Sequence, residues 1–377
     1  MKVKLDKNQD NLELLAKVGS RKKAESEAAQ EILATLVSGI VEQVLQQAAT
    51  SELIYDTRTY DFDTVPSIPL DLFEDNTENY IRVWTQNIAG GLPTSLIHGA
   101  GEYRFQTYRL DSAVSFLKRY AKDGRLDVVA KAIERMGQEL LVDMEDNAWA
   151  PVLSALADSS IDTNTNHLIS ATTAGRFQLD DLNRLWTKVM RIHTSWTGGT
   201  PTSLKGKKGL TDLLISPEIL EDIRAFAYQP MNTTAVPDTA ESTAVPLPDQ
   251  VRMQFFSQAG VPSIFGVGLH VLNELGVGKE YNTVFDSYYT ATGTQPTFNG
   301  STQEVVIGVD MTQDAFIRAV ASEPTSDFDV DSPANYGTVI TRPDDQFNAR
   351  DEAIGWYTRM EEGRVVVDNK ALVGVVV

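Results

Sequence analysis

The sequence predicts an α+β protein built from more than one folding unit. Its 377 residues, at about 150 residues per domain, suggest two or three units. Apolar residues recur at helical spacing over two long segments in the first half, whereas short β-type runs alternate with helices further along. With 42% hydrophobic and 23% charged residues, the composition allows a real core and is not that of a disordered chain.

Four helices are expected in the first half of the sequence. Residues 24–49 carry a broad apolar stripe, which either packs in the chain's own core or docks on a neighbouring subunit. Residues 127–157 predict the longest helix, about 45 Å at 1.5 Å per residue, and Pro151 is expected to bend it near its end. Shorter helices are expected at 112–122 and at 179–194.

Two extended regions lie between these helices. Residues 55–75 predict a linker lying along another surface, because Pro66 and Pro69 disfavour a helix. Residues 79–109 predict a long β-hairpin with a glycine-rich tip, whose arms each reach about 33 Å. A hairpin of two strands is marginal in water, so we expect this one to lie on another surface, such as the next subunit.

An α/β region follows. A strand at 210–215 leads into a helix that runs to about residue 228, where Ser216 supplies the N-cap and Pro217 the first turn. The acidic, proline-bearing stretch 323–345 predicts a second linker or loop. Further β-type runs are found at 263–272, 304–309 and 365–377.

The charge is strongly acidic and unevenly distributed. The net charge of the chain is −19, which disfavours a sequence-reading DNA binder because most of its surface repels phosphate. Residues 1–23 nevertheless carry +4, so the remainder carries −23. The basic residues of this segment are Lys2, Lys4, Lys7, Lys17, Arg21, Lys22 and Lys23. The segment is either a solvated tail or an arm that contacts a different partner from the body.

The chemistry of an enzyme or of a metal site is missing from the sequence patterns. Without cysteine the chain has no disulfide, cysteine-ligated zinc, iron–sulfur cluster or thiol nucleophile. The four histidines (His98, His167, His193 and His270) show no metal-ligand spacing. The run starting at Asp327 begins like a calcium loop, but Ser332 replaces the required glycine. We therefore expect no catalytic residue, no metal and no cofactor.

The membrane criteria also point away from a membrane protein. No apolar run approaches the ~20 residues of a span, and no hydrophobic segment follows the N-terminal lysines. We therefore expect neither a transmembrane segment nor a signal peptide.

The order of these elements, together with two local segments, resembles a known family. The first segment is Leu213-Leu214-Ile215-Ser216-Pro217-Glu218, which enters a helix. The second runs from Ile354-Gly355-Trp356-Tyr357 to Arg364-Val365-Val366-Val367-Asp368. Over essentially the whole chain the sequence resembles the major capsid protein of tailed bacteriophages, which has the Hong Kong 97 type of shell fold.

The resemblance implies a division into five parts. These would be an N-terminal arm with helix and linker (1–75), an extended E-loop hairpin (76–110), a peripheral domain with the long spine helix (111–205), an axial domain (206–322) and a return to the peripheral domain with closing strands (323–377). It implies a non-enzymatic structural protein of the virion capsid, assembled in the host bacterial cytoplasm into an icosahedral head around the genome.

The resemblance also implies where partners bind. The chain would contact itself in pentamers and hexamers, and also scaffolding, portal and cement or decoration proteins. It would contact packaged double-stranded DNA non-specifically if at all, and no membrane. The basic residues of segment 1–23 would make arm contacts. The E-loop tip would supply the subunit interface through Gly90, Gly91, Leu92, Pro93, Leu96 and Ile97.

Covalent cross-linking of the shell is not expected. Some relatives join a lysine of the E-loop to a neighbour, but no lysine occurs here between Lys23 and Lys118. Two alternatives to a phage shell stay open at this point. They are an encapsulin-like compartment with the same fold, and an α/β enzyme that uses an unrecognised site in residues 195–320.

Overall fold

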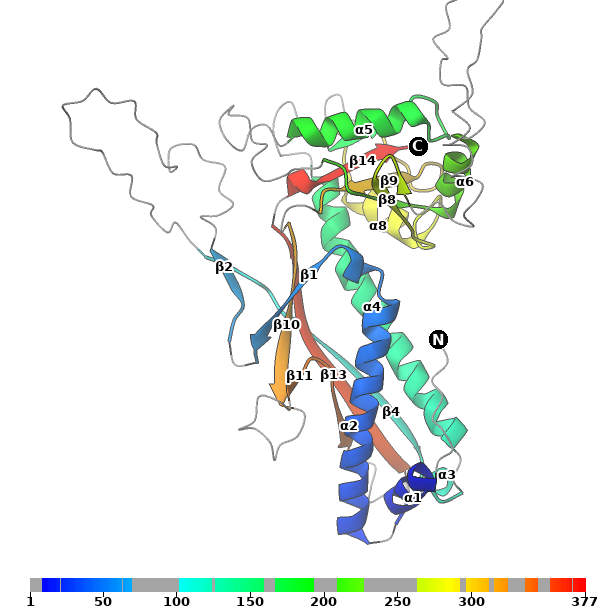
Figure 1. Cartoon of the computed structure of the whole chain (residues 1–377), viewed down its shortest axis with the longest axis vertical. Coiled ribbons are helices and arrows are strands. Elements are labelled where there is room, and N and C mark those ends of the chain that lie inside the picture. Colours follow the sequence, from blue (N-terminus) through cyan, green and yellow to red (C-terminus); the bar gives the residue numbers. More distant parts are fainter. Residues whose placement is uncertain are drawn as a thin grey trace, which may run out of the picture. The chain divides into compact units, whose positions relative to one another are not determined.

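A computed structural model gives the fold of the chain in two compact units (Figure 1). The first unit comprises Met1–Pro69, Gly101–Trp149 and Phe316–Val365, and the second comprises Leu70–Ala100, Ala150–Ala315 and Val366–Val377. The residues that the structure describes are 9–20, 22–62, 64–69, 102–123, 126–158, 167–192, 209–226, 263–291, 296–311, 315–324, 336–344, 353–367 and 369–377. Helices and strands mix in both units, so the α+β class is confirmed.

The first unit contains a six-stranded sheet centred on one long strand. That strand, β13 (Ala353–Val366), pairs antiparallel with β4 (Tyr108–Leu117) and β12 (Ile340–Asp344). The path of the sheet is β1-β10-β13-β12, and β1 (Asp56–Asp61) runs parallel to β10 (Phe316–Pro324). The short β11 (Tyr336–Gly337) pairs with β10.

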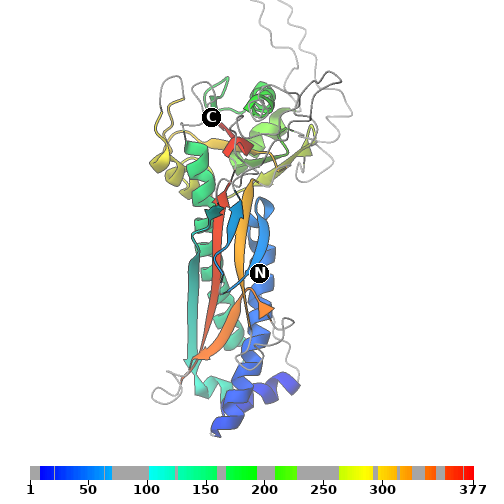
Figure 2. The same ribbon diagram turned by 90° about the vertical axis from the view of Figure 1, so that its left-hand side faces the viewer.

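Two long helices run alongside this sheet (Figure 2). They are α2 (Lys23–Ala48) and α4 (Leu126–Ala157), with the short α1 (Gln9–Val18) and α3 (Lys118–Lys122) beside them. The buried sides of α2 and α4 share one apolar core with the sheet, which includes Val41, Met144 and Trp356. The rings of Phe116 and Trp356 lie 5.0 Å apart within this core.

The helices predicted at 24–49 and 127–157 are confirmed, but the helix predicted at 112–122 is wrong for its first six residues. The chain continues as β4 to Leu117, and only Lys118–Lys122 is helical. Leu110 and Phe116 are buried on one face of β4, whereas Asp111 is exposed on the other. This alternation has the period of a strand, and pairing with β13 along ten residues outweighs local helix propensity.

The expectation that no segment is apolar enough for a membrane span is also corrected. Ala24–Leu45 within α2 reaches a mean hydropathy of 1.2 and is long enough to cross a bilayer. However, 44% of this stretch is buried within the protein. The buried side chains, such as Leu33 and Val37, belong to the core of the first unit, so α2 serves there as a core helix.

The second unit contains a different six-stranded sheet. Its order is β5 (Leu168–Ser170), β14 (Leu372–Val376), β9 (Val305–Val309), β6 (Asp212–Ile215), β8 (Val267–Val271) and β7 (Ser263–Ile264). Every residue of β9 and β14 is buried, as expected of strands covered on both faces. The helices of this unit are α5 (Leu179–Ile192), α6 (Pro217–Ala225) and α8 (Glu280–Tyr288).

Most of the local predictions for the second unit are confirmed. Ser216 caps α6 by accepting a hydrogen bond from the backbone N–H of Ile219, and Pro217 occupies the first turn. The run predicted at 263–272 is a hairpin, in which Phe265 and Gly266 turn with φ of 50° and 82°. The sequence patterns did not predict helix α8.

The stretch 323–345, predicted as a linker or loop, is partly wrong. It contains the end of β10, the short β11 and the whole of β12, all of which belong to the sheet of the first unit. The acidic and proline residues suggested a loop, because composition carries no information about which strands these segments pair with.

Candidate subunit interface

Most of the residues predicted to contact other subunits lie outside the described residues. This applies to all six residues of the predicted tip at 90–97, and to Lys2, Lys4, Lys7 and Arg21. Lys17 is exposed near the end of α1, Lys22 is exposed at the N-cap of α2, and Lys23 is the first residue of α2. The contacts assigned to these residues stay predictions.

The structure does describe the two chain segments that flank the predicted loop. Strand β2 (Ser67–Pro69) pairs antiparallel with β3 (Glu102–Arg104), so the two strand ends that flank residues 70–101 lie side by side. The N–H of Phe105 donates to the carbonyl of Pro66 at 3.0 Å. Ile68 and Phe105 are only 7% and 6% exposed, so this root is anchored by burial. The pairing begins earlier in the chain than the hairpin predicted at 79–109.

Two tyrosines tie the strands on either side of this root to β13. The hydroxyl of Tyr60, on β1, donates to Glu361 Oε1 at 3.1 Å, and that of Tyr108, on β4, donates to Glu362 Oε1 at 2.7 Å. Burial, and then the neighbouring carboxylate, raise the pKa of both tyrosines, so both stay neutral donors. Because adjacent strand residues face opposite sides, the two bonds hold β13 from both faces.

A buried cluster of charges lies next to the Tyr108 bond. Glu362 accepts from Arg318 Nε at 2.7 Å and from Arg364 Nε at 3.0 Å, and Arg318 also pairs with Glu52. Burial alone would raise the pKa of Glu362, but the guanidiniums of Arg364 and Arg318 outweigh it and lower that pKa. Burial has the opposite effect on Arg318 and lowers its pKa, but a guanidinium stays protonated at neutral pH. The cluster is therefore ionised when folded.

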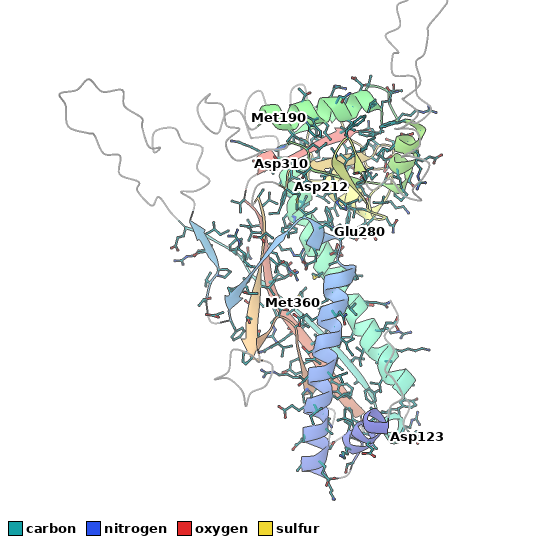
Figure 3. All side chains as sticks on the ribbon, viewed as in Figure 1. Asp123, Met190, Asp212, Glu280, Asp310 and Met360 are labelled. Carbon is teal, nitrogen blue, oxygen red and sulfur yellow. The ribbon has the colours of Figure 1, made fainter. Side chains whose placement is uncertain are left out.

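This cluster connects elements that are far apart in the sequence. Glu52 follows α2, Arg318 lies on β10, and Glu362 and Arg364 lie on β13. The Nη2 atom of Arg318 is 3.8 Å from the sulfur of Met360, which Figure 3 labels. Because breaking a buried ion pair leaves an uncompensated charge, the cluster fixes the geometry of these strands.

A second anchor holds the chain where α2 ends. Glu145 of α4 accepts hydrogen bonds from the backbone N–H and the hydroxyl of Ser51, the latter at 2.7 Å. It also accepts from the hydroxyl of Thr50 and, at 3.1 Å, from Trp149 Nε1. One carboxylate thus fixes the direction in which the chain passes from α2 towards β1.

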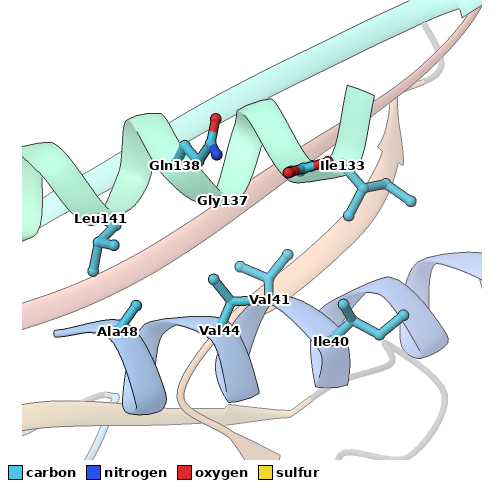
Figure 4. Close-up of a pocket in the computed structure, with 9 residues that line it drawn as sticks. Ile40, Val41, Val44, Ala48, Ile133, Gly137, Gln138 and Leu141 are labelled. Carbon is cyan, nitrogen blue, oxygen red and sulfur yellow. The ribbon is translucent and has the colours of Figure 1, made fainter. Parts of the chain in front are cut away.

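An apolar groove of about 130 Å³ lies between α2 and α4 (Figure 4). Ala48 and Val44 of α2 lie across from Leu141 of α4, and Ile40 lies across from Ile133 at the other end of the groove. Nearby on α2, the side chains of Ile32 and Leu36 are 58% and 40% exposed. Its lining is suited to holding apolar side chains, and only Glu134 and Gln138 bring polar groups to it.

In the second unit, a histidine and a carboxylate pair between two neighbouring strands. His270 Nε2 lies 2.9 Å from Asp212 Oδ1, which links the adjacent strands β8 and β6. Gly268 leaves room for this pair, because a Cβ there would come within 2.5 Å of Asp212 Oδ1. In the part of the chain that the structure describes, no group of three or more His, Asp or Glu side chains is placed to hold a metal ion.

Comparison with known proteins gives weak similarities in fold only. No model of a known protein family matches the chain, and no curated protein matches it. The capsid of cyanophage P-SCSP1u is 12% identical, with 85% of this chain and 86% of that chain covered and a TM-score of 0.47. A structure from Gordonia phage Cozz is 14% identical, with 87% and 85% covered and a TM-score of 0.43.

An encapsulin complex is also among the similar structures. The one from Synechococcus elongatus is 12% identical, with 73% of this chain and 75% of that chain covered and a TM-score of 0.35.

Proposed function

We propose that this chain is a structural, non-enzymatic major capsid protein that assembles with copies of itself into the icosahedral head of a tailed bacteriophage. The observation that carries the proposal is the braced root formed by β2 and β3. The first unit anchors both ends of the segment between Pro69 and Glu102, and holds the flanking strands by part-buried hydrogen bonds. Rigid anchoring of both ends suits a segment that contacts another molecule.

The sequence of this segment supports a contact with an apolar surface. Residues 88–97 contain no charged side chain, in a chain that is 23% charged. They include Leu92, Leu96 and Ile97, and burying one such side chain contributes about 1.5–3 kcal/mol. Summed over all subunits of a shell, this free energy is large, while each single contact is weak enough to break and reform during assembly. A second copy of the chain is the partner that a shell brings closest.

The charge of the chain supports a container for DNA. A body of strongly negative charge does not adsorb phosphate, so packaged DNA can move in and out. Pentamers and hexamers of this chain would form the head, with scaffolding, portal and cement proteins as further partners. The virion capsid would be its location, after assembly in the host bacterial cytoplasm.

A double substitution at the predicted tip tests this proposal. Leu92→Asp with Ile97→Asp should leave a folded, soluble subunit that does not close shells, because two carboxylates replace the apolar contact. Val277→Asp is the matched control, since Val277 is 49% exposed and lies in the second unit. Circular dichroism reports folding, and electron microscopy reports closure. Normal shells from the double variant would contradict the assignment of the tip.

The contents of the particles separate the two kinds of shell. A phage head is expected to package DNA when the other phage proteins are supplied, whereas an encapsulin-like shell would enclose protein. Nuclease-protected DNA in particles purified from infected or reconstituted cells supports the phage assignment. Particles that hold only a protein cargo would favour the encapsulin-like alternative.

A further inference from the structure

Two basic stretches of the sequence form an exception to the acidic body. Residues 1–27 and 118–135 together carry thirteen basic and eight acidic side chains, a net charge of +5, whereas the rest of the chain carries −24. The stretches are about 90 residues apart in the sequence, so only the fold can show whether they act together.

The fold of the first unit brings them to the same end. Helix α1 packs against both α2 and α3, and Leu15, Ala121 and Val129 belong to one core (Figure 1). Five basic side chains on these helices and α4, or at their ends, are exposed, and we name them the basic end. They are Lys17, Lys22, Arg119, Lys131 and Arg135.

The backbone adds to the positive charge. Helices α2 and α4 both begin at this end, where unpaired N–H groups give each helix a partial positive charge (Figures 1 and 2). Lys22 occupies the N-cap of α2 and makes no side-chain cap hydrogen bond. Cations are disfavoured at helix N-termini, so Lys22 is placed where an external anion would be stabilising.

Carboxylates are interspersed on the same surface. Glu25 pairs with Lys22 at 2.9 Å, and Glu13, Glu27 and Asp123 are exposed. A surface of mixed sign suits a protein segment with a few spaced carboxylates better than a continuous phosphate backbone.

We propose that the basic end docks the acidic segment 325–331 of a second copy of the chain. This segment contains Asp327, Asp329 and Asp331 among seven residues and has no basic side chain. Pairing of β10 with β11 ties the chain on both sides of it, with Glu323 opposite Gly337. Since one chain carries both complementary surfaces, the contact runs head to tail and can repeat around a closed ring. The inference rests on the proposed self-assembly and names one of its contacts.

Binding of a peptide tests the contact without requiring shells. A fluorescein-labelled peptide of residues 323–336 should bind the full-length chain, and more weakly as salt is raised. Replacing its three aspartates by asparagine should weaken binding about tenfold, and so should Lys131→Glu with Arg135→Glu in the chain. Lys279→Glu is the control, because Lys279 is an exposed N-cap lysine of α8 in the second unit.

Equal binding of the aspartate and asparagine peptides would overturn the proposal, whatever the chain variants do. The alternative partner is nucleic acid. The surface would be assigned to nucleic acid if a 30-base-pair DNA binds the chain tightly, if the Lys131→Glu, Arg135→Glu chain loses that binding, and if the peptide does not compete with it.

Charge reversal tests the contact in assembly. The chain with Lys131→Glu and Arg135→Glu should lose shells, and adding Asp327→Lys and Asp329→Lys should restore them. A contact between copies should also be restored by mixing two chains, one with only the lysine and arginine reversed and one with only the two aspartates reversed. If mixing does not restore association, the contact is within one copy and the proposal is overturned. If the wild-type chain itself forms no shells, the proposed function fails, while the peptide measurement still decides this contact.

Discussion

Each of the two units contains a six-stranded sheet, and the two sheets differ in how far their strands are buried. In the second unit the strands β9 and β14 are buried at every residue, and the core around them is apolar. In the first unit β1 is exposed at every position except Tyr60, and the cluster around Glu362 places charges inside. The central strands of the second unit's sheet are therefore covered, whereas the edge strand β1 of the first unit is not.

Exposed apolar side chains occur in both units. In the first unit Phe62 after β1 and Val65 before β2 are exposed close in sequence to the braced root, and Ile32 and Leu36 are exposed on α2. In the second unit Phe265 is the most exposed of the large hydrophobic residues described, and it lies in a tight turn. Because the exposed residues beside the braced root belong to the first unit, we expect interface substitutions to act mainly there.

The largest effect is expected at the buried charge cluster. Glu362→Gln leaves Arg318 and Arg364 without their shared counter-charge, which should destabilise the first unit by about 3–5 kcal/mol. Hydrogen exchange should show faster opening of β10 and β13 with β9 and β14 unchanged. Glu280→Gln, at an exposed residue of α8, is the control. Equal protection in wild type and Glu362→Gln would contradict a structural role for the cluster.

An intermediate effect is expected from overpacking the second unit. A Cβ at Gly308 would come within 2.5 Å of Leu210 Cδ1 and 2.9 Å of Leu185 Cδ2, both buried. Gly308→Ala should therefore lower the free energy of unfolding by about 1–3 kcal/mol, as measured by urea denaturation.

The matched substitution in the first unit should have the opposite sign. Gly39 is exposed in α2, and a Cβ added there would meet no atom within 4 Å, so Gly39→Ala should stabilise by about 0.5–1 kcal/mol. Destabilisation by both substitutions would mean that the two units do not differ in packing as we describe.

The smallest effect concerns pH, and it has opposite signs in the two units. The pKa of Glu362 is lowered on folding, so its contribution is present above the ordinary glutamate pKa and is lost as pH falls through the lowered value. The pKa of Glu304 is raised by burial and then by Glu218 and Asp222, so its contribution is present at low pH and is lost as pH rises through the raised value.

Acidification from neutral pH should therefore loosen the first unit relative to the second. Hydrogen exchange corrected for intrinsic rates, measured at neutral and at mildly acidic pH, checks the direction. Glu304→Gln keeps an acceptor for the Ser216 hydroxyl, which lies 2.6 Å from Glu304 Oε2, and should remove the dependence in the second unit. A second unit that loosens first on acidification would contradict the assignment.

Local signals in the sequence were sufficient for part of this fold. The long apolar stripes predicted α2 and α4, and Ser216-Pro217 predicted the start of α6, because periodicity and capping act over a few residues. Strand β4 was mistaken in part for a helix, since its partner β13 lies more than 230 residues later.

The candidate site was less predictable for the same reason. Arg318 and Glu52 are 266 residues apart in the sequence, and neither lies in a motif that predicts their ion pair. The basic residues of 1–23 were evident from composition. That the second basic stretch, residues 118–135, lies beside α1 depends on tertiary packing and could not be predicted from the sequence. The predicted loop tip at 90–97 lies outside the described residues and stays a prediction.

Covalent cross-links can be checked on the same particles. With no cysteine and no lysine between Lys23 and Lys118, we expect a single band near 41.5 kDa after boiling in denaturant. A ladder of multimers would show a cross-link from elsewhere in the chain.

Electron microscopy of the purified protein decides whether this chain closes into a shell. We expect closed icosahedral particles with fivefold and sixfold clusters of subunits, formed from the chain alone or with scaffolding protein supplied. Monomers or small open oligomers at every concentration, with scaffolding protein present and the subunit folded by circular dichroism, would contradict it.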